Sequence, residues 1–200
     1  MDKKHWVEEK FEECGAILDG HFVLASERHS KTYLEKALVY VNPEIVSELC
    51  YQMAINVGLS SKVSVSNIEC VVGPSLGGII LSQFTAYHLS SMFSKNVLSL
   101  FTEKDAAGKQ VLKRGYQKLI AGKRVLIVDD ILTTGESIKQ VAQAVEQAGG
   151  IIVAVAVICN REDVTSAKLG YPLFCLWRTN IESWPAKECP LCQRGIPITM

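Results

Sequence analysis

Two adjacent carboxylates, Asp129 and Asp130, lie at the centre of the stretch whose residue types most clearly suggest chemistry. The run before them, residues 125–128, is apolar and mostly β-branched, which is typical of a strand buried on both faces of a parallel sheet. A short segment with three hydroxyl side chains and one glycine follows: Ile131, Leu132, Thr133, Thr134, Gly135, Glu136 and Ser137. Apolar residues then recur at helical spacing from Ile138 until a glycine pair at 149–150. The stretch is therefore predicted to form a strand, an acidic step, a polar turn and a helix.

The polar turn has the composition of a site for one phosphate group. Free N–H groups at the start of a helix, helped by the hydroxyls of Thr133, Thr134 and Ser137, can surround a phosphate, and Gly135 lets the backbone come close to it. The neighbouring carboxylates would repel a phosphate but would accept hydrogen bonds from hydroxyl groups. A ribose 5-phosphate satisfies both demands, with its 2- and 3-hydroxyls on the carboxylates and its phosphate in the turn. Magnesium near the acidic pair is also compatible with this arrangement.

A second strand, turn and helix is predicted at residues 68–93. The apolar strand 68–72 leads into a glycine-rich turn, 73–78, and then into an apolar helix, 79–93. The turn lacks the Gly-Lys-Ser/Thr ending of a nucleotide triphosphate loop, and it also lacks the dinucleotide-binding pattern. Its glycines can present N–H groups to an anion, although a turn that merely packs tightly is an equally good interpretation.

Two later strands are each followed by cationic residues. The strand at 97–101 precedes a basic segment interrupted by glycines, 102–116, which is either a solvated hairpin or a mobile lid whose cations meet a departing anion. The strand at 151–159 is followed by Arg161. Open α/β sheets bind ligands at the carboxyl ends of their strands, and the planar guanidinium fork matches a carboxylate. The alternative is a surface arginine paired with one of the two acidic residues that follow it.

The order of these elements predicts an α/β protein with a parallel sheet. Further helices are predicted at residues 3–14 and 43–57, the second as core or subunit contact, and a last strand at 173–176. The loops after the strands would bring the glycine turn, the basic segment, the acidic pair and Arg161 into one cleft. We expect a single domain over residues 1–200, because 200 residues with 48% hydrophobic content suit one well-buried core.

Charge and hydropathy argue against several classes of function. The formal net charge is zero, which gives no electrostatic basis for binding nucleic acid or acidic membranes. The longest apolar run, 151–159, is too short to cross a bilayer, and the first residues are too charged for a signal peptide. Four of the seven cysteines lie in apolar surroundings, as reduced core thiols do: Cys50, Cys70, Cys159 and Cys175. We therefore expect a cytoplasmic protein.

Cys189 and Cys192 form a Cys-x-x-Cys pair near the C-terminus. Such a pair supplies two of the four ligands of a structural zinc site, and no histidine nearby in the sequence completes it. A redox pair would be expected in a βα context, which this tail lacks. The tail is therefore expected to be structural, with zinc as the less favoured alternative.

Residues 125–137 resemble the signature of type I phosphoribosyltransferases, which bind 5-phosphoribosyl 1-diphosphate (PRPP) with Mg²⁺. The resemblance implies the fold of that family, a parallel-sheet α/β fold with a small hood formed by the N- and C-terminal segments. It also implies that Mg²⁺ is carried by PRPP and is not held directly by protein side chains. The implied catalytic residues are Asp129, Asp130 and Lys104. The implied PRPP contacts come from these three and from Ser75, Gly77, Ile131, Leu132, Thr133, Thr134, Gly135, Glu136 and Ser137.

Residues 21–36 resemble the N-terminal part of orotate phosphoribosyltransferases, where a Ser-Gly-Arg-x-Ser-x-x-Tyr pattern forms one wall of the base site. The implied orotate site consists of Tyr33, Leu34, Thr133 and Arg161. The implied reaction transfers phosphoribosyl from PRPP to N1 of orotate, giving orotidine 5-phosphate and pyrophosphate for pyrimidine synthesis. The implied assembly is a homodimer whose lid loop reaches the neighbouring subunit's site.

The chain departs from this family pattern at several positions. Glu27 replaces the glycine of the pattern, and Ala25 and Gly77 stand where some orotate enzymes carry lysine. Ala106 and Ala107 stand where some carry a further lysine and a histidine in the lid. Three other hypotheses stay open: a signalling receiver domain, a type I transferase that acts on a purine base, and a non-catalytic regulator that binds PRPP on the same fold.

Overall fold

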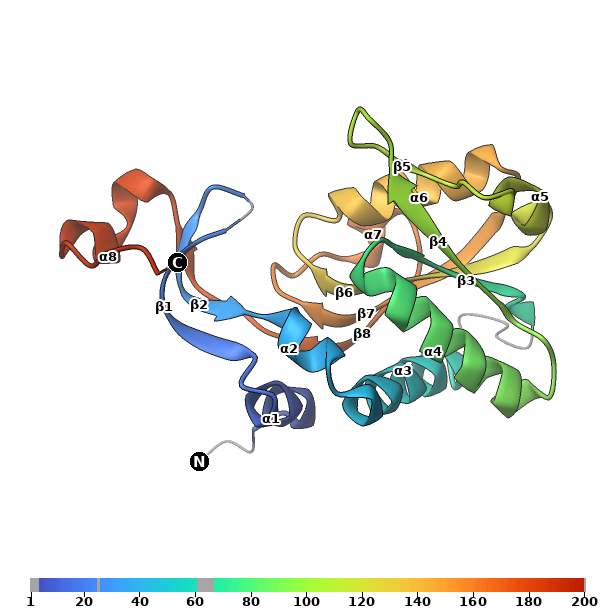
Figure 1. Ribbon diagram of the computed structural model, residues 1–200, viewed down its shortest axis with the longest axis horizontal. Helices are drawn as coiled ribbons and strands as arrows, with labels where there is room; N and C mark the ends of the chain where they lie inside the picture. The colour runs from blue at the N-terminus through green and yellow to red at the C-terminus, as the bar shows by residue number, and fades with distance from the viewer. Residues whose placement is uncertain (1–3, 25, 61–66, 200) are drawn as a thin grey trace.

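The computed structural model describes residues 4–24, 26–60 and 67–199, which form an α/β body and a smaller hood (Figure 1). The body is built on a six-stranded sheet in the order β5-β4-β3-β6-β7-β8. Its strands are β3 (Cys70–Pro74), β4 (Leu98–Lys104), β5 (Gln110–Val111), β6 (Arg124–Leu132), β7 (Ile151–Asn160) and β8 (Leu173–Arg178). Neighbouring strands pair in parallel, except that the short edge strand β5 is antiparallel to β4. The predicted α/β parallel sheet is confirmed, with this one antiparallel edge as an addition.

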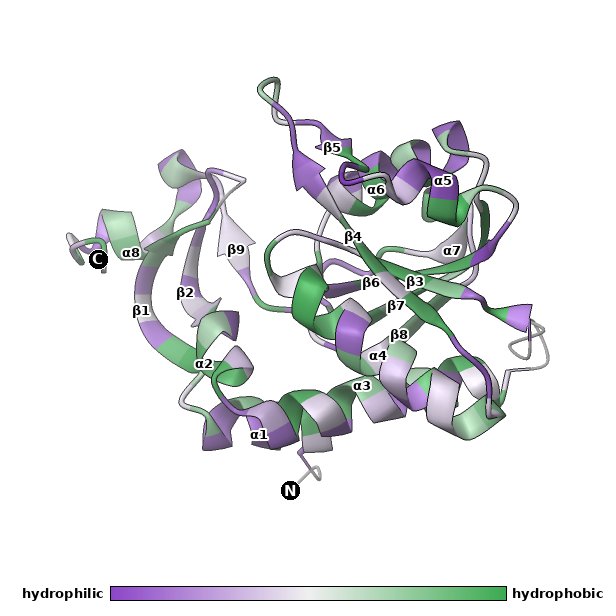
Figure 2. Ribbon diagram, turned by 45° about the vertical axis from the view of Figure 1, so that its right-hand side comes forward, coloured by the Kyte–Doolittle hydropathy of each residue, from purple (hydrophilic) through white to green (hydrophobic). Residues whose placement is uncertain are grey.

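Helices cover both faces of the sheet and close two hydrophobic clusters. One face packs against α1 (Trp6–Glu13), α3 (Pro43–Gly58) and α4 (Gly77–Phe93), and the other against α5 (Tyr116–Ile120), α6 (Glu136–Gln147) and α7 (Ser166–Leu169). Because both faces are covered, the side chains of residues 125–128 in β6 are fully buried, as their composition predicts. The central strands are accordingly among the most hydrophobic parts of the molecule (Figure 2).

The hood combines the two ends of the chain. A three-stranded antiparallel sheet joins β1 (Ile17–Val23) and β2 (His29–Leu34) to β9 (Ser183–Trp184). The short helix α2 (Lys36–Tyr40) leads from β2 into the body, and the tail beyond β9 contains a 3-10 helix, η2 (Ala186–Glu188), and α8 (Pro190–Gln193). Figure 1 shows these segments together at one side of the sheet. The predicted hood of N- and C-terminal segments is confirmed.

The structure corrects the expected boundaries of the central strand and the basic segment. Pairing with β7 continues to Leu132 opposite Asn160, so Asp129 and Asp130 lie inside β6 and do not follow it. The basic segment forms a hairpin, because β4 extends to Lys104 and pairs in antiparallel with β5, which follows it in the chain. The N-terminal helix was expected over residues 3–14. Residue 3 lies outside the described residues, and the helix begins at Trp6 and ends at Glu13. No helix in the described part of the chain is both long and apolar enough to cross a membrane.

Candidate active site

A cavity of about 160 Å³ opens at the carboxyl ends of β3, β4 and β6. These parallel strands are neighbours in the sheet, so the loops that follow them meet at one edge. Residues predicted to bind PRPP line much of the cavity: Ser75, Gly77, Lys104, Asp129, Asp130, Ile131 and Ser137. The predicted meeting of the glycine turn, the basic segment and the acidic pair is confirmed, whereas Arg161, which was expected in the same cleft, does not line this cavity.

Asp130 is 4% exposed and is held on both carboxylate oxygens. Its Oδ1 lies 2.9 Å from Nζ of Lys36 and accepts the backbone N–H of Ile131 at 2.6 Å, while its Oδ2 accepts the hydroxyl of Tyr40 at 2.5 Å. Burial lowers the pKa of Lys36, but the charge of Asp130, its hydrogen bond to Lys36 and the charge of Asp129 together more than compensate, so this pKa lies above its ordinary value and Lys36 is a cation. Burial, and then the charge of Asp130, raise the pKa of Tyr40, so the phenol keeps its proton and remains a donor.

Asp129 is 8% exposed but is much less fully satisfied than Asp130. Its Oδ1 accepts the backbone N–H of Asp130 at 2.9 Å, and its Oδ2 accepts no hydrogen bond from the residues that the structure describes. Burial raises the pKa of Asp129 well above its usual range, and the negative charge of Asp130 raises it further. A ligand hydroxyl group that donated to Oδ2 would supply the missing hydrogen bond. Of the two carboxylates, Asp129 is therefore the more available acceptor.

The turn after β6 leaves backbone donors free, as the phosphate hypothesis requires. Gly135 has a φ of 86°, in the left-handed region that favours glycine, and its conformation turns the chain into α6. Within the described chain, the backbone N–H groups of Thr133, Thr134 and Gly135 meet no acceptor. Ile131 already donates its N–H to Asp130, and the side chain of Leu132 is buried in the hydrophobic cluster under α6. The N–H of Glu136 donates to Oγ1 of Thr134 at 3.3 Å, so the donors available to an anion are those of Thr133, Thr134 and Gly135, followed by Ser137 in the first turn of the helix.

The glycine-rich turn packs tightly, which for two of its glycines supports a role in packing and not in anion binding. A Cβ on Gly73 would lie 2.2 Å from the carbonyl oxygen of Gly78, and a Cβ on Gly78 would lie 2.6 Å from Cδ of Pro74. Ser75 donates its N–H to the carbonyl of Thr102 at 2.9 Å, so it offers a ligand only its hydroxyl group. Backbone crowding thus accounts for Gly73 and Gly78 without any ligand.

Lys104 ends β4 at the base of the hairpin and lines the cavity. The hairpin tip is organised by Asp105, whose carboxylate accepts the N–H groups of Ala107 and Lys109 at 2.9 Å each. Two other cations of this segment are engaged elsewhere: Arg114 pairs with Glu103 at 3.0 Å, and Lys113 donates to the carbonyl of Lys104 at 3.2 Å. The segment is thus a hairpin in this structure, its role as a lid stays a prediction, and Lys104 is its cation at the cavity.

Arg161 follows β7 and is fixed beside the central motif, because its N–H donates to the carbonyl of Leu132 at 2.9 Å. The residue is only 9% exposed, although it was expected at the surface in the alternative interpretation. Its Nη2 pairs with Glu162 at 3.4 Å, and its buried Nε finds no hydrogen-bond partner in the described chain. A buried guanidinium with an unused N–H has capacity for an anionic ligand.

Comparison with known proteins decides the family. The profile of the Phosphoribosyl transferase domain matches residues 53–190, which include the cavity loops and Arg161. The chain belongs to the phosphoribosyltransferase family. The orotate phosphoribosyltransferase of Caldicellulosiruptor saccharolyticus is 38% identical over 99% of this chain and 95% of its own length. That of Acidithiobacillus ferrooxidans is 39% identical over 92% of this chain and 89% of its own length. This membership removes the receiver-domain hypothesis.

Solved structures of phosphoribosyltransferases share the fold at lower sequence identity. Orotate phosphoribosyltransferase from Aeropyrum pernix aligns with a TM-score of 0.65 at 22% identity, over 86% of this chain and 93% of that one. Adenine phosphoribosyltransferase from Thermoanaerobacter pseudethanolicus aligns with a TM-score of 0.56 at 21% identity, over 74% of this chain and 88% of that one. Because enzymes named for different bases share this fold, the choice of base must be argued from the side chains.

The hood segment that was expected to meet the base places its two predicted residues on opposite faces of β2. Tyr33 packs against Phe22, with 5.4 Å between the ring centroids, and does not line the cavity. The side chain of Leu34 is buried in the hydrophobic cluster of the body. Neither Tyr33 nor Leu34 lines the cavity of this phosphoribosyltransferase.

Sequence reasoning missed Lys36 and Tyr40 as members of the site. Both residues lie on α2, and both reach Asp130 from the hood side. Their spacing of four residues puts them on the same face of a helix, which is the single local signal that could have paired them. Nothing in the sequence near them indicates an acidic partner as distant as Asp130, which is 94 residues from Lys36 and 90 residues from Tyr40.

Proposed function

We propose that the protein transfers phosphoribosyl from PRPP to N1 of orotate, releasing orotidine 5-phosphate and pyrophosphate in pyrimidine synthesis. The observation that carries the choice of base is Arg161, a buried guanidinium at the edge of the central motif whose Nε has no partner in the described chain. Orotate offers a carboxylate to such a group, whereas the neutral purine bases do not. The names of the relatives that match nearly the whole chain support the same choice.

In this proposal the sugar binds across the acidic pair. Asp129 accepts the ribose hydroxyls, while Lys36 and Tyr40 keep Asp130 in place and balance its charge. The free N–H groups at Thr133, Thr134 and Gly135 bind the 5-phosphate, with Ser137 beside them. Cleavage of the bond between C1 and pyrophosphate leaves positive charge on the sugar ring, and the carboxylates lower the energy of that charge. Lys104 and the hydroxyl of Ser75 lie where the leaving pyrophosphate would gather negative charge.

The residues present fit a magnesium ion that arrives on PRPP better than one held by the protein. Both oxygens of Asp130 are engaged, and the Lys36 ammonium at 2.9 Å would repel a cation placed against that carboxylate. Asp129 alone cannot supply the several oxygen ligands that Mg²⁺ requires. Bound to the diphosphate, Mg²⁺ would neutralise the charge that develops on the leaving group. This chain then needs only to leave room for it.

For the base, we assign the carboxylate of orotate to Arg161 and one face of its ring to Tyr33. Thr133 is the first residue of the phosphate turn, and we assign it to either the phosphate or the base. Leu34 contributes its backbone or the packing of the hood, since its side chain lies in the body cluster. Glu27 lies in the turn between β1 and β2 with a φ of 60°, at the position where the family pattern has glycine. Because Glu27 does not line the cavity, the change from glycine to glutamate affects the turn and not the cavity.

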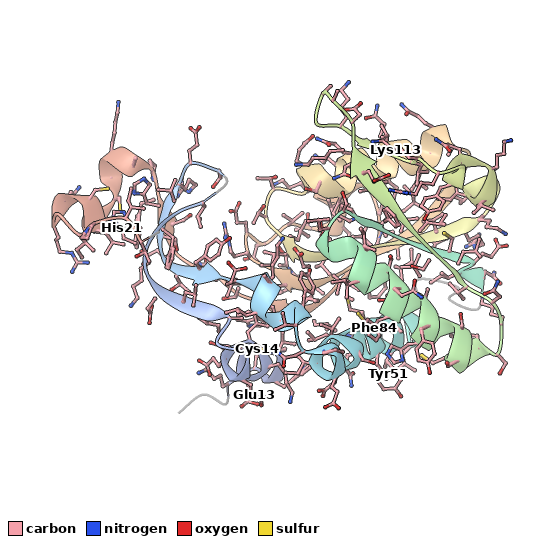
Figure 3. The ribbon with its side chains drawn as sticks, viewed as in Figure 1. Glu13, Cys14, His21, Tyr51, Phe84 and Lys113 are labelled. Atoms are coloured by element: carbon pink, nitrogen blue, oxygen red, sulfur yellow. The ribbon has the colours of Figure 1, made fainter. Side chains whose placement is uncertain are left out.

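We further propose a homodimer formed through the outer surface of α3 and α4. Three large side chains are exposed there, Tyr51 at 42%, Tyr87 at 63% and Met92 at 39% (Tyr51 is labelled in Figure 3). The hairpin tip around Asp105 extends away from its own body and is the part of the lid that would reach a partner's site (Figure 1). None of the seven cysteines is joined in a disulfide, which supports a reducing compartment such as the cytoplasm.

The reaction is tested by following the ultraviolet absorbance of orotate after PRPP and Mg²⁺ are added, with hypoxanthine, adenine and uracil as competing bases. Consumption of orotate, and of orotate alone, supports the proposal. Turnover of adenine or hypoxanthine would assign the chain to a purine base. Binding of PRPP without turnover of any base would leave a non-catalytic regulator.

A further inference from the structure

Four potential metal ligands meet in the hood, far from the cavity between the strand ends. His21 lies on β1, His29 lies on β2, and Cys189 and Cys192 lie on the tail. One ligand atom from each side chain falls within 4.8 Å of all the others, and only Cys192 is exposed. Figure 3 shows His21 in this part of the hood, on the opposite side of the molecule from Lys113 and the hairpin.

The distances between these atoms match those of a tetrahedral zinc site. Zn–S bonds of about 2.3 Å and Zn–N bonds of about 2.0–2.1 Å at the tetrahedral angle place sulfur and nitrogen about 3.5 Å apart. Here Sγ of Cys189 and Sγ of Cys192 each lie 3.6 Å from Nε2 of His21, and Sγ of Cys192 lies 3.3 Å from Nδ1 of His29. The two nitrogens are 2.8 Å apart and would separate by about half an ångström around an ion.

The surrounding hydrogen bonds orient His21 as a ligand. Its Nδ1 lies 2.7 Å from the carbonyl oxygen of Ile196, which can only accept, so Nδ1 carries the proton and Nε2 presents its lone pair to the cluster. A backbone carbonyl that fixes the tautomer of a histidine in this way is the usual outer partner of a metal-bound imidazole. Without an ion, the single lone pair of Nε2 faces three potential donors, Nδ1 of His29 and two thiols. A cation satisfies all four atoms at once.

The two halves of the hood are joined by the pairing of β2 with β9 and by hydrogen bonds from Arg28 and Ser30 to residues 182–183, with little apolar packing. Neither hydrophobic cluster contains a residue from the described parts of 18–33 or 182–199. Besides the bond from its Nδ1 to Ile196, His21 joins β1 to the tail by two bonds with Thr199: its N–H donates to Oγ1 of Thr199 at 3.0 Å, and Thr199 N–H donates to the carbonyl of His21 at 2.7 Å. Small units with so little apolar burial are commonly stabilised by a structural metal ion.

We propose that His21, His29, Cys189 and Cys192 bind one structural zinc ion that fastens the C-terminal tail to the β1–β2 hairpin. Two sulfur and two nitrogen ligands in a closed set of four favour Zn²⁺ and leave no open position for catalysis. Binding requires both cysteines as thiolates and releases their protons, and His29 carries its own proton on Nε2. The histidines that would complete the Cys-x-x-Cys pair are not nearby in the sequence: His29 is 163 positions from Cys192, and His21 is 171 positions from it.

The direct test is the metal content of the full chain, purified without a histidine tag from cells grown with added zinc. We expect about one zinc ion per chain by elemental analysis. The double variant Cys189→Ser/Cys192→Ser should lose it, whereas the matched control Cys14→Ser, a partly buried cysteine outside the cluster, should keep it. A strong chelator should lower the melting temperature of the wild type and of the control, but not that of the double variant.

A second measurement does not depend on the variants. Replacing zinc with Co²⁺ should give the visible absorption of tetrahedral cobalt together with a thiolate-to-cobalt charge-transfer band. Wild-type protein without bound metal would overturn the proposal, whether its thiols were free or joined as a Cys189–Cys192 disulfide in mass spectrometry. Zinc retained by the double variant would overturn it as well.

Discussion

The hydroxyl group of Tyr40 donates a hydrogen bond to Oδ2 of Asp130, and the two atoms meet against Cα of Gly77. A Cβ at position 77 would lie 2.3 Å from the Tyr40 hydroxyl oxygen and 2.6 Å from Oδ2 of Asp130. The lysine that some orotate enzymes carry at this position therefore has no room here. Lys36, which contacts the same carboxylate from α2, supplies a cation at this corner of the cavity instead.

Gly77→Ala should therefore disturb the acidic pair. The added methyl group must displace Tyr40 or Asp130, and we expect a loss of about tenfold or more in kcat/KM for PRPP, equivalent to about 1.4 kcal/mol. The matched control is Gly58→Ala, whose Cβ would lie 3.6 Å from Cε of Met92 and needs no displacement. If both variants show wild-type kinetics, the close packing of Gly77 against Tyr40 and Asp130 is not needed for activity.

Lys36→Ala should weaken both folding and turnover. It leaves a buried carboxylate without its ion pair, although Lys36 is itself 47% exposed, so we expect a loss of only about 1 kcal/mol in the free energy of unfolding. Activity should fall further than stability, because Asp130 would no longer be balanced beside a charged substrate. Chemical denaturation and initial-rate kinetics measure the two effects. Lys118→Ala, at an exposed position of α5, is the control and should change neither.

Asp129→Asn should stabilise the protein while abolishing most of its activity. Burial raises the pKa of Asp129, so the folded state binds more protons than the unfolded state above the ordinary pKa of an aspartate, and stability falls as the pH rises through that window. Asparagine has no such proton to lose. We expect its melting temperature to exceed that of the wild type by about 2–4 °C or more near pH 8, and the difference to vanish near pH 4. The control Asp19→Asn, on an exposed part of β1, should show no pH-dependent gain.

Arg161→Ala should raise the KM for orotate much more than the KM for PRPP. The guanidinium is proposed to bind the carboxylate of the base, and the loss of a charge-assisted pair costs about 1.5–3 kcal/mol, or about ten- to a hundredfold in KM. Arg178→Ala removes an exposed arginine that pairs with Asp163 at 3.6 Å, and it should leave both constants unchanged. Equal effects of Arg161→Ala on the two constants would place Arg161 outside the base site.

Local patterns predicted the sheet, the acidic pair and the phosphate turn, because each depends on residues within one strand, turn and helix. The hydrophobic period of residues 125–145 is set by burial on both faces of β6 and one face of α6, so composition alone indicates it. Lys36, Tyr40 and the histidines of the hood could not be found in this way. Their partners lie 90 to 171 positions away, and only the fold brings these segments together.

The position of Lys104 indicates that the base and the tip of the lid hairpin serve different subunits. Since Lys104 lines the cavity of its own chain together with Asp129, we expect it to serve that chain's site, and only the hairpin tip beyond it to reach a partner. Lys104→Ala should lower kcat strongly, and Lys109→Ala, at the tip, should have the smaller effect.

Mixing the two inactive variants Lys104→Ala and Asp129→Asn tests which subunit Lys104 serves. In a mixed dimer with Lys104 acting in its own chain, each site carries one damaged residue, so exchange of subunits should restore no activity. If Lys104 instead crossed to the partner, one site of every mixed dimer would be intact, and about a quarter of the wild-type activity would return. A tag on one variant verifies that subunits have exchanged, so that a lack of activity can be attributed to mixed dimers and not to a failure to form them. Recovery would move Lys104 from the base of the hairpin into the shared part of the lid.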